Sequence, residues 1–191
     1  MIDATTASAR RAAGSRPAVI RRGRVRVAPG AAIAAAVTLA LAGTLVLRPA
    51  PVLLWNASPS SPVGLYAVRS PARLNPGDTA IAWPPSAARR LAAERHYLPA
   101  GVPLVKQVAA TDGARVCARG KTILVNGRRA ALRRSRDRAG RRLPWWSGCR
   151  RLRKGDLFLL APDVPEAFDG RYFGVTHPSE VIGAGRLLWQ G

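Results

Sequence analysis

Residues 56–66 have the sequence NASPSSPVGLY, in which three serines are interleaved with two prolines. Proline fixes its own backbone φ angle, so this stretch has little local freedom and can hold a hydroxyl group in one position. The same composition is also typical of an ordinary loop or linker. The stretch therefore predicts a rigid loop, and any chemistry assigned to it needs a partner elsewhere in the chain.

Short runs that favour β-strands fill most of the chain after this loop, and turn residues separate them. One helix is expected over 86–95, with Ser86 as its cap, because alanine, leucine and arginine favour helix there. The Asn126-Gly127 pair predicts a tight hairpin turn. The expected fold is mostly β, a folded-over sheet or barrel. The predicted strands are 63–68, 79–83, 102–109, 114–118, 122–125, 156–161, 172–176 and 185–189.

An apolar segment precedes the loop. Residues 30–47 contain no charged side chain and are bracketed by Arg26 and Arg48, a length at the lower end for a membrane-spanning helix. A cleavable signal peptide is the alternative, and an uncleaved signal anchor is the prediction. We expect a basic cytoplasmic tail over 1–28, a transmembrane anchor over 29–47, and a domain over 48–191 in the periplasm, held at the inner membrane.

The net charge of +21 first suggests a protein that binds nucleic acid. Seven of the 31 basic residues precede the apolar segment, where cytoplasmic positive charge is expected, and the others are scattered. Their densest run, 128–142, includes a polar segment over 133–142 that predicts an exposed loop. No specific nucleic-acid partner is therefore predicted.

The chain has 28 arginines and only three lysines, Lys106, Lys121 and Lys154. Lys121 and Lys154 lie beside turn residues and are expected in solvent. Lys106 lies in VPLVKQVAA (102–110), among apolar residues. Desolvation lowers the pKa of a lysine and allows it to act as a base, which arginine cannot do. Lys106 is therefore a candidate general base, unless it lies on the solvent face of its strand.

Other residues that carry chemistry form no recognisable site. His96 and His177 both lie in polar or turn sequence, which favours surface positions over a serine–histidine–aspartate triad. Cys117 and Cys149 have no pair of histidines at metal-binding spacing, so neither a metal site nor a cofactor is predicted. In an oxidising compartment the two cysteines are expected to form a disulfide, and two separately buried thiols are the alternative.

Three motifs occur in order along the chain. They are SSPVGLY at 60–66, preceded by Asn56; VKQV at 105–108, followed by Asp112-Gly113; and DGRYFG at 169–174. Together they resemble the three signature boxes of membrane-anchored serine signal peptidases (family S26, which includes leader peptidase). The first box is most similar to the TraF branch, the conjugative-transfer maturation peptidases.

By this resemblance Ser60 is the nucleophile and Lys106 the general base. Ser58 matches a position whose hydroxyl helps to bind the oxyanion, and the Ser60 backbone N–H is the second donor. Asp169 and Arg171 match an acidic-basic pair that supports the site. From the residues alone, these last two also fit a turn aspartate and a surface arginine.

The sequence departs from the family pattern at four places. Ser61 stands where methionine is frequent, and Gln107 replaces a frequent arginine. The turn after the lysine has become Ala-Thr-Asp-Gly at 110–113. Ala167 stands where relatives often carry a serine that hydrogen bonds with the lysine, so the orientation of that lysine is left open.

The resemblance implies a membrane-anchored serine endopeptidase that matures a conjugative pilin precursor, with cyclisation of the product left open. Its expected partners are that precursor peptide and the lipid bilayer. Trp55 and the leucines at 53–54 fit either contact with the membrane interface or ordinary packing. Two alternatives remain: a general signal peptidase that cleaves secretory signal peptides, and a non-catalytic basic component of a transfer channel.

Overall fold

In the computed structural model, residues 29–47, 52–70 and 73–191 are described. The chain divides into two units, Met1–Pro49 and Ala50–Gly191. In the first, helix α1 (Pro29–Leu47) coincides with the predicted anchor, while the predicted tail over 1–28 lies outside the described residues. Over the described ranges, no helix combines the length and apolar character needed to cross a membrane. The membrane anchor stays a prediction.

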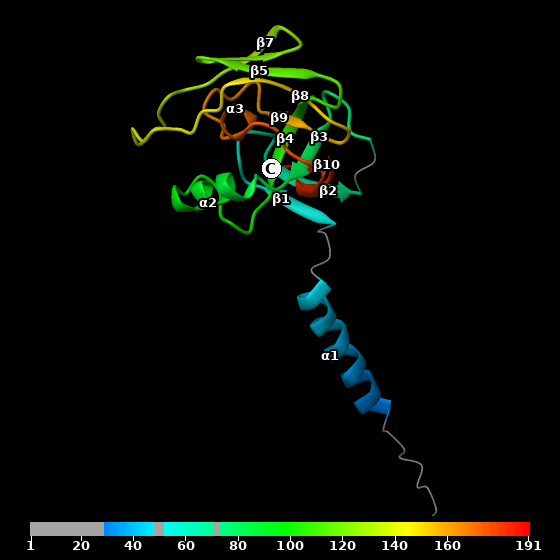
Figure 1. Cartoon of the computed structure of the whole chain (residues 1–191). Coiled ribbons are helices and arrows are strands. Elements are labelled where there is room, and N and C mark those ends of the chain that lie inside the picture. The colour runs from blue at the N-terminus through cyan, green and yellow to red at the C-terminus, as the bar shows by residue number, and fades with distance from the viewer. Residues whose placement is uncertain (1–28, 48–51, 71–72) are drawn as a thin grey trace, which may run out of the picture. The chain divides into compact units, whose positions relative to one another are not determined.

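A six-stranded sheet organises the second unit (Figure 1). The strand order is β1-β2-β10-β3-β4-β9, and every neighbouring pair is antiparallel. The long last strand lies between β2 and β3, so the end of the chain closes the middle of the sheet. The strands are β1 (Leu53–Asn56), β2 (Gly64–Arg69), β3 (Thr79–Ala82), β4 (Leu104–Ala110), β9 (Phe158–Leu160) and β10 (Val181–Gln190).

A second, four-stranded sheet has the order β7-β6-β5-β8. Its strands are β5 (Arg115–Arg119), β6 (Thr122–Val125), β7 (Arg128–Leu132) and β8 (Gly148–Arg151). Asn126 and Gly127 both have positive φ, 49° and 80°, which confirms the tight hairpin turn between β6 and β7. In Figure 1 β5 and β7 lie at the opposite end of this unit from β1.

A disulfide joins the two central positions of the β5–β8 pair. Cys117 and Cys149 are directly opposite in the register, with their Cα atoms 4.0 Å apart and their sulfurs bonded. The predicted disulfide is therefore confirmed. It holds β8, whose four residues are all exposed, against the buried strand β5.

The helices of this unit are short: α2 (Ser86–Glu94), α3 (Gly170–Phe173) and the 3₁₀ turn η1 (Pro178–Glu180). The helix expected over 86–95 is confirmed, but its cap was wrong. Pro85 occupies the N-cap position and no side chain caps the helix. The strand expected over 172–176 was also wrong, because Asp169 accepts a hydrogen bond from the backbone N–H of Arg171 and starts α3 there.

The expectation of a mostly β fold is confirmed, and a closed barrel is not what forms. Among the described strands, β1 and β9 each pair on one side only, so the larger sheet is open. Strands β1, β7 and β8 had not been predicted. β7 and β8 are arginine-rich and mostly exposed, so they lack an apolar signal, whereas β1 is apolar but only four residues long.

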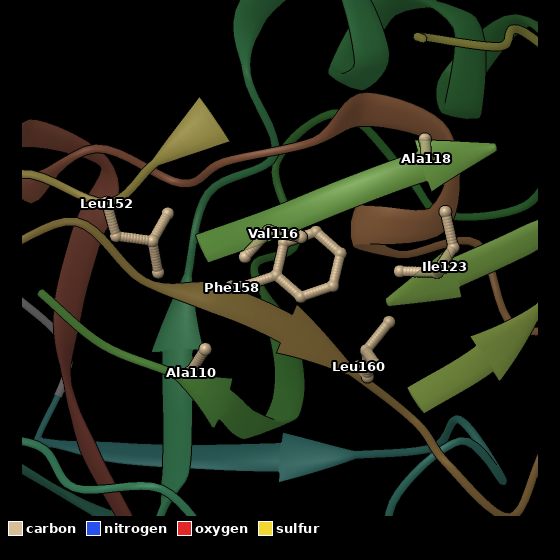
Figure 2. Packing of buried hydrophobic residues seen from close by; sticks show 7 residues of the cluster. All are labelled: Ala110, Val116, Ala118, Ile123, Leu152, Phe158 and Leu160. Carbon is tan, nitrogen blue, oxygen red and sulfur yellow. The ribbon is translucent and has the colours of Figure 1, made fainter. Parts of the chain in front are cut away.

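The core between the sheets is centred on Phe158, which is fully buried among aliphatic side chains from both sheets (Figure 2). Burial of this kind supplies most of the favourable free energy of folding. One member of the interior was missed: Arg133, expected at the start of an exposed loop, is 2% exposed. The residues that form the apolar cluster with Phe158 are Ala110, Val116, Ala118, Ile123, Leu152 and Leu160.

Candidate active site

The loop between β1 and β2 is held from inside by one buried amide. Asn56 ends β1, and its Nδ2 donates to the carbonyl oxygens of Ser58, Ser61 and Pro62 at 3.0, 3.2 and 3.0 Å. Its Oδ1 accepts a hydrogen bond from the Ser58 N–H at 3.1 Å. Because these bonds involve the loop backbone, they fix the path of the chain on both sides of Ser60. The sequence had marked Asn56 only as the residue that precedes the first motif, and this buried role was not predicted.

Two further hydroxyls tie this loop to the sheet. Ser61 Oγ donates to the carbonyl oxygen of Val105 at 2.8 Å, and Tyr66 OH donates to that of Pro62 at 2.9 Å. Val105 directly precedes Lys106 in β4. The bond therefore sets the residue after Ser60 against the residue before Lys106, which gives Ser61 a role that the sequence did not assign.

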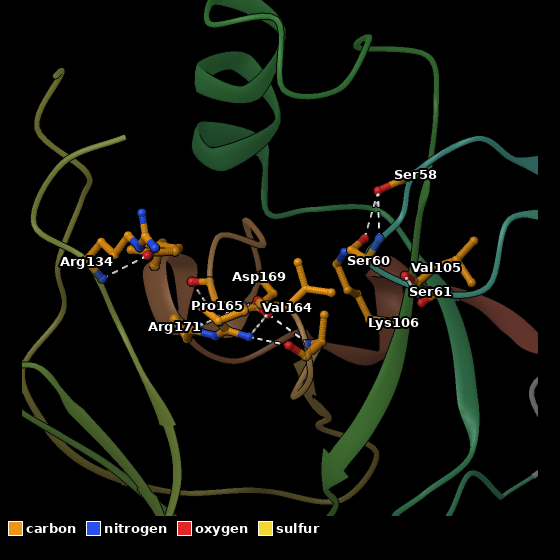
Figure 3. Close-up of polar contacts among 12 residues, drawn as sticks. Ser58, Ser60, Ser61, Val105, Lys106, Arg134, Val164, Pro165, Asp169 and Arg171 are labelled. Carbon is orange, nitrogen blue, oxygen red and sulfur yellow. Dashed lines mark hydrogen bonds and ion pairs between the residues drawn. The ribbon is translucent and has the colours of Figure 1, made fainter. Parts of the chain in front are cut away.

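Lys106 lies in β4, a strand paired on both sides by β3 and β9. Its side chain is 3% exposed, so the alternative of a solvent-facing lysine was wrong. Nζ of Lys106 and Oγ of Ser60 form a hydrogen bond (Figure 3). Burial lowers the pKa of Lys106 from 10.5 to about 8; the Asp169 carboxylate opposes this fall and the Arg171 guanidinium adds to it. A neutral amine is therefore accessible near physiological pH.

Ser58 lies beside the same hydroxyl. The Oγ atoms of Ser58 and Ser60 are 2.8 Å apart, and the Ser60 N–H donates to Ser58 Oγ at 3.4 Å. Both groups expected to bind an oxyanion are thus next to Ser60 Oγ. They interact with each other here, with the Ser60 N–H directed at Ser58 Oγ.

Asp169 and Arg171 form a buried ion pair, 3.1 Å between Oδ2 and Nη2. The two carboxylate oxygens also accept the backbone N–H groups of Ala161 and Arg171, at 2.9 and 3.0 Å. Burial raises the pKa of the Asp169 carboxyl, while Arg171 and these N–H groups oppose that rise. The Asp169 carboxylate thus acts on Lys106 through its charge, and Asp169 and Arg171 are both buried beside the lysine. The reading of Arg171 as a surface charge was wrong.

The guanidinium of Arg171 staples a loop that borders the lysine. Nη1 donates to the carbonyl oxygens of Val164 and Pro165, each at 2.9 Å, and Nη2 also binds the carbonyl oxygen of Ala161 (Figure 3). Arg133 and Trp146, from the segment between β7 and β8, contact the backbone at the start of α3. Trp146 Nε1 donates to the Gly170 carbonyl at 3.0 Å.

Arg133 is the functional support that the sequence missed. Its guanidinium lies over the Trp145 ring, 4.2 Å from the centroid, and donates to the carbonyl oxygens of Gly120 and Trp146 at 2.9 and 2.8 Å. A longer bond, 3.4 Å, reaches the Arg171 carbonyl. In a chain with 28 arginines, nothing in the local pattern distinguishes this one.

Ser60 and Lys106 open onto a cleft with a volume of about 780 Å³. Ala167 lines this cleft, at the position where relatives often have a serine that hydrogen bonds with the lysine. Among the described residues, the hydrogen-bond acceptor found for Lys106 Nζ is Ser60 Oγ. His96 lines the cleft from an exposed position, and His177 pairs with Asp156 elsewhere. Within the described ranges no cluster of side chains fits a metal ion.

Residues 25–190 match the family model of signal peptidase, peptidase S26. This match covers most of the 191 residues, so the chain belongs to the peptidase S26 family, the signal peptidases. The family resemblance of the three motifs is thereby confirmed, and a serine peptidase activity follows from membership.

Within that family the chain is of the TraF type. A plasmid transfer protein TraF from Escherichia coli is 33% identical over 162 residues, covering 79% of this chain and 89% of the relative. A second Escherichia coli plasmid transfer protein TraF is 32% identical over 166 residues, covering 82% and 91%. The crystal structure of a signal peptidase I from Enterococcus faecalis V583 is 18% identical with a TM-score of 0.35, covering 60% of this chain and 98% of that one.

Proposed function

We propose that this chain is an endopeptidase in which Ser60 is the nucleophile and Lys106 the general base. The observation that carries the proposal is the hydrogen bond between Lys106 Nζ and Ser60 Oγ, made by a lysine that is 3% exposed. A serine hydroxyl needs a base to take its proton, and a desolvated lysine with a pKa near 8 is suited to that task.

In the first step, the neutral amine of Lys106 accepts the proton of Ser60 Oγ while that oxygen bonds to the carbonyl carbon of the scissile peptide. The carbonyl oxygen becomes an oxyanion, which the Ser60 N–H and the Ser58 hydroxyl can bind after Ser58 turns outward. Each such donor is typically worth about 3 kcal/mol of barrier.

In the second step, the protonated Lys106 gives its proton to the leaving amine and the C–N bond breaks. The acyl group remains on Ser60 Oγ. A water molecule, deprotonated by Lys106, then releases the acyl group and restores the enzyme. If the N-terminal amine of the acylated chain attacks in place of water, the product is cyclic.

The substrate in this proposal is the precursor of a conjugative pilin, and the site of action is the periplasmic face of the inner membrane. The plasmid transfer function of the two similar proteins supports the substrate. The uncharged segment 30–47, flanked by arginines, supports an N-terminal anchor. Trp55 and Trp189 pack together, 5.6 Å between ring centroids, with both rings substantially exposed, which suits an interfacial contact.

The test is processing of a pilin precursor co-expressed with the full chain. Ser60→Ala and Lys106→Ala are expected to accumulate the precursor, because each removes one partner of the proton transfer. Ser179→Ala and Lys154→Ala are matched controls, since both residues are exposed and lie outside the cleft. Normal processing by Lys106→Ala would contradict the mechanism.

The dyad variants and a complementation assay with the wild type separate this proposal from its two alternatives. A non-catalytic channel component predicts that both dyad variants support transfer. A general signal peptidase predicts that the wild type restores growth of a cell depleted of its own signal peptidase, and that secretory precursors are cut as fast as pilin. Cutting of the pilin precursor without such rescue would favour the dedicated enzyme.

A further inference from the structure

A loop rich in arginine forms one wall of the cleft that contains Ser60. This arginine loop, residues 134–143, has the sequence RSRDRAGRRL. It folds as an irregular hairpin: Arg136 and Arg142 are bridge partners, and the Leu143 N–H donates to the Ser135 carbonyl at 3.0 Å. The loop therefore presents its side chains from a defined backbone.

One of its two carboxylate anchors lies within the loop. Asp137 accepts hydrogen bonds from the hydroxyl of Tyr97, from the Arg141 N–H at 2.8 Å and from Arg141 Nε at 2.7 Å. Burial works to raise the pKa of Asp137, but the bonds from Tyr97 and Arg141 outweigh it and lower that pKa to about 2. The anchor is thus ionised over the whole physiological pH range, and it fastens the loop to the segment after α2.

The other anchor is Glu166, which comes from the loop that Arg171 staples. It pairs with Arg134, 3.0 Å between Oε1 and Nη1, and with Arg138. The side chains of Arg134 and Arg138 are 54% and 84% exposed, against 31% for Glu166. Figure 3 shows Arg134 and Ser60 on opposite sides of the segment that carries Val164, Pro165 and Asp169.

The outer surface of this wall is positive because the arginines cover the carboxylates. Asp137 is 8% exposed, whereas its partner Arg141 is 42% exposed. Apart from Lys106, the charged residues that line the cleft are five arginines and two carboxylates. The rest of the cleft lining is mostly apolar and includes Leu98 and Val102. The five arginines are Arg95, Arg134, Arg136, Arg138 and Arg141.

We propose that the arginine loop binds acidic side chains of the polypeptide substrate while the bond to be cut lies at Ser60. Carboxylates are the natural partners of exposed guanidinium groups with free donors. Since the loop and Ser60 line one cleft, a single extended chain can occupy both parts. The inference rests on the proposed function, and it adds a preference for acidic residues that the family motifs do not encode.

A polypeptide is favoured over nucleic acid as the occupant because the positive charge lies within a cleft whose remaining wall is apolar. A phosphate backbone would need a longer basic track and would leave the apolar part unused. Exposed ion pairs are individually weak, so the preference should be modest and should fall as salt screens it.

The first experiment measures binding without catalysis. Full-length Ser60→Ala protein in detergent is titrated with fluorescent peptides that have alanine at the bond to be cut, in matched versions carrying two glutamates or two glutamines at successive positions on either side. We expect at least one glutamate peptide to bind about three- to tenfold more tightly at about 50 mM salt and the difference to vanish at about 500 mM. Equal binding of every matched pair would overturn the proposal.

The second experiment changes the loop. Arg134→Gln/Arg138→Gln should abolish the glutamate preference, and Arg134→Glu/Arg138→Glu should transfer it to lysine peptides. The control Arg150→Gln/Arg151→Gln removes two exposed arginines of β8, outside the cleft, and should leave the preference intact. Tryptophan fluorescence checks that each variant is folded. A preference that survives Arg134→Gln/Arg138→Gln would refute the role of the loop.

Cleavage by the wild-type enzyme separates this inference from the proposed function. If the glutamate and glutamine peptides are cut with equal kcat/KM and bind equally, the endopeptidase stands and the acidic preference does not. If none is cut but the glutamate preference in binding depends on the loop, the inference stands and the endopeptidase assignment is in question. If the loop variants lose binding of a DNA oligonucleotide and keep peptide selectivity, the loop is a nucleic-acid surface and the proposal is wrong.

Discussion

Replacing Lys106 by methionine should abolish activity and stabilise the fold at neutral pH. The side chain is 3% exposed, and burial lowers its pKa from 10.5 to about 8. At about 1.36 kcal/mol for each pKa unit, holding this lysine in the folded state costs about 3 kcal/mol when it is protonated. Methionine has a similar length and no charge, but the variant loses a hydrogen bond to Ser60 worth about 1 kcal/mol. We expect a net gain of about 2 kcal/mol in the free energy of unfolding at pH 7.

The sign of the pH dependence follows from the lowered pKa. Below pH 8 the lysine is protonated in both folded and unfolded chains, so the full cost is present. Between about pH 8 and 10.5 the unfolded chain binds more protons, and the wild type therefore gains stability as pH rises. The advantage of Lys106→Met should thus shrink through this window and reach about zero near pH 10.

Urea unfolding of the full chain in detergent, followed by tryptophan fluorescence, measures this difference. All five tryptophans lie in the Ala50–Gly191 unit, so the signal reports on that unit. Lys154→Met, in an exposed turn, is the control and should change stability by less than about 0.5 kcal/mol. The reasoning fails if Lys106→Met is less stable than the wild type by the same amount at pH 7 and pH 10.

Three further outcomes are expected. The kcat/KM of peptide cleavage should rise with pH through an apparent pKa near 8, because the neutral amine of Lys106 is the active form; a profile flat from pH 6 to 9 would argue against that base. Gly64→Ala should cost about 3 kcal/mol or more in urea unfolding, since a Cβ there would overlap the Trp189 carbonyl oxygen, whereas Gly77→Ala, in open space, should cost about 1 kcal/mol. Replacing Cys117 and Cys149 together by alanine should lower stability by about 2–4 kcal/mol, as judged by thermal unfolding with and without reductant; an unchanged midpoint would show that β8 needs no covalent tie.

Local sequence predicted the parts of the fold whose signals are local. Runs that favour β-strands predicted β2 to β6, β9 and β10 to within a few residues, and Asn126-Gly127 predicted its hairpin turn. The strand expected over 172–176 failed because the Asp169 side chain caps a helical turn, which outweighed the β-preference of the aromatic residues there. Strand β8 was not predicted because its residues are exposed and it is held in place by a partner strand far away in the sequence.

In the candidate site as well, some features were predicted from the sequence and others depended on the tertiary structure. The resemblance of the three ordered motifs to a known family singled out Ser60, Lys106 and the Asp169–Arg171 pair, whereas the residues alone pointed only to Lys106 as a candidate base. Whether the lysine lay in solvent or in the core depended on its strand being paired on both sides, which only the sheet topology decided. The bond from Ser61 to the Val105 carbonyl spans 44 residues of sequence, a separation that no local pattern can encode.

The arginines show most clearly what the sequence alone does not predict. In the sequence Arg133 and Arg134 are adjacent and indistinguishable, and Arg171 differs from them only by lying in the third motif. In the structure Arg171 is paired in the interior, Arg133 stacks on a tryptophan, and Arg134 stands in the cleft. Sequence by itself determined the chemistry available to this protein: a candidate nucleophile, a candidate base and an excess of positive charge. Tertiary structure decided which charges are desolvated and which reach a substrate, because burial depends on neighbours brought together by folding.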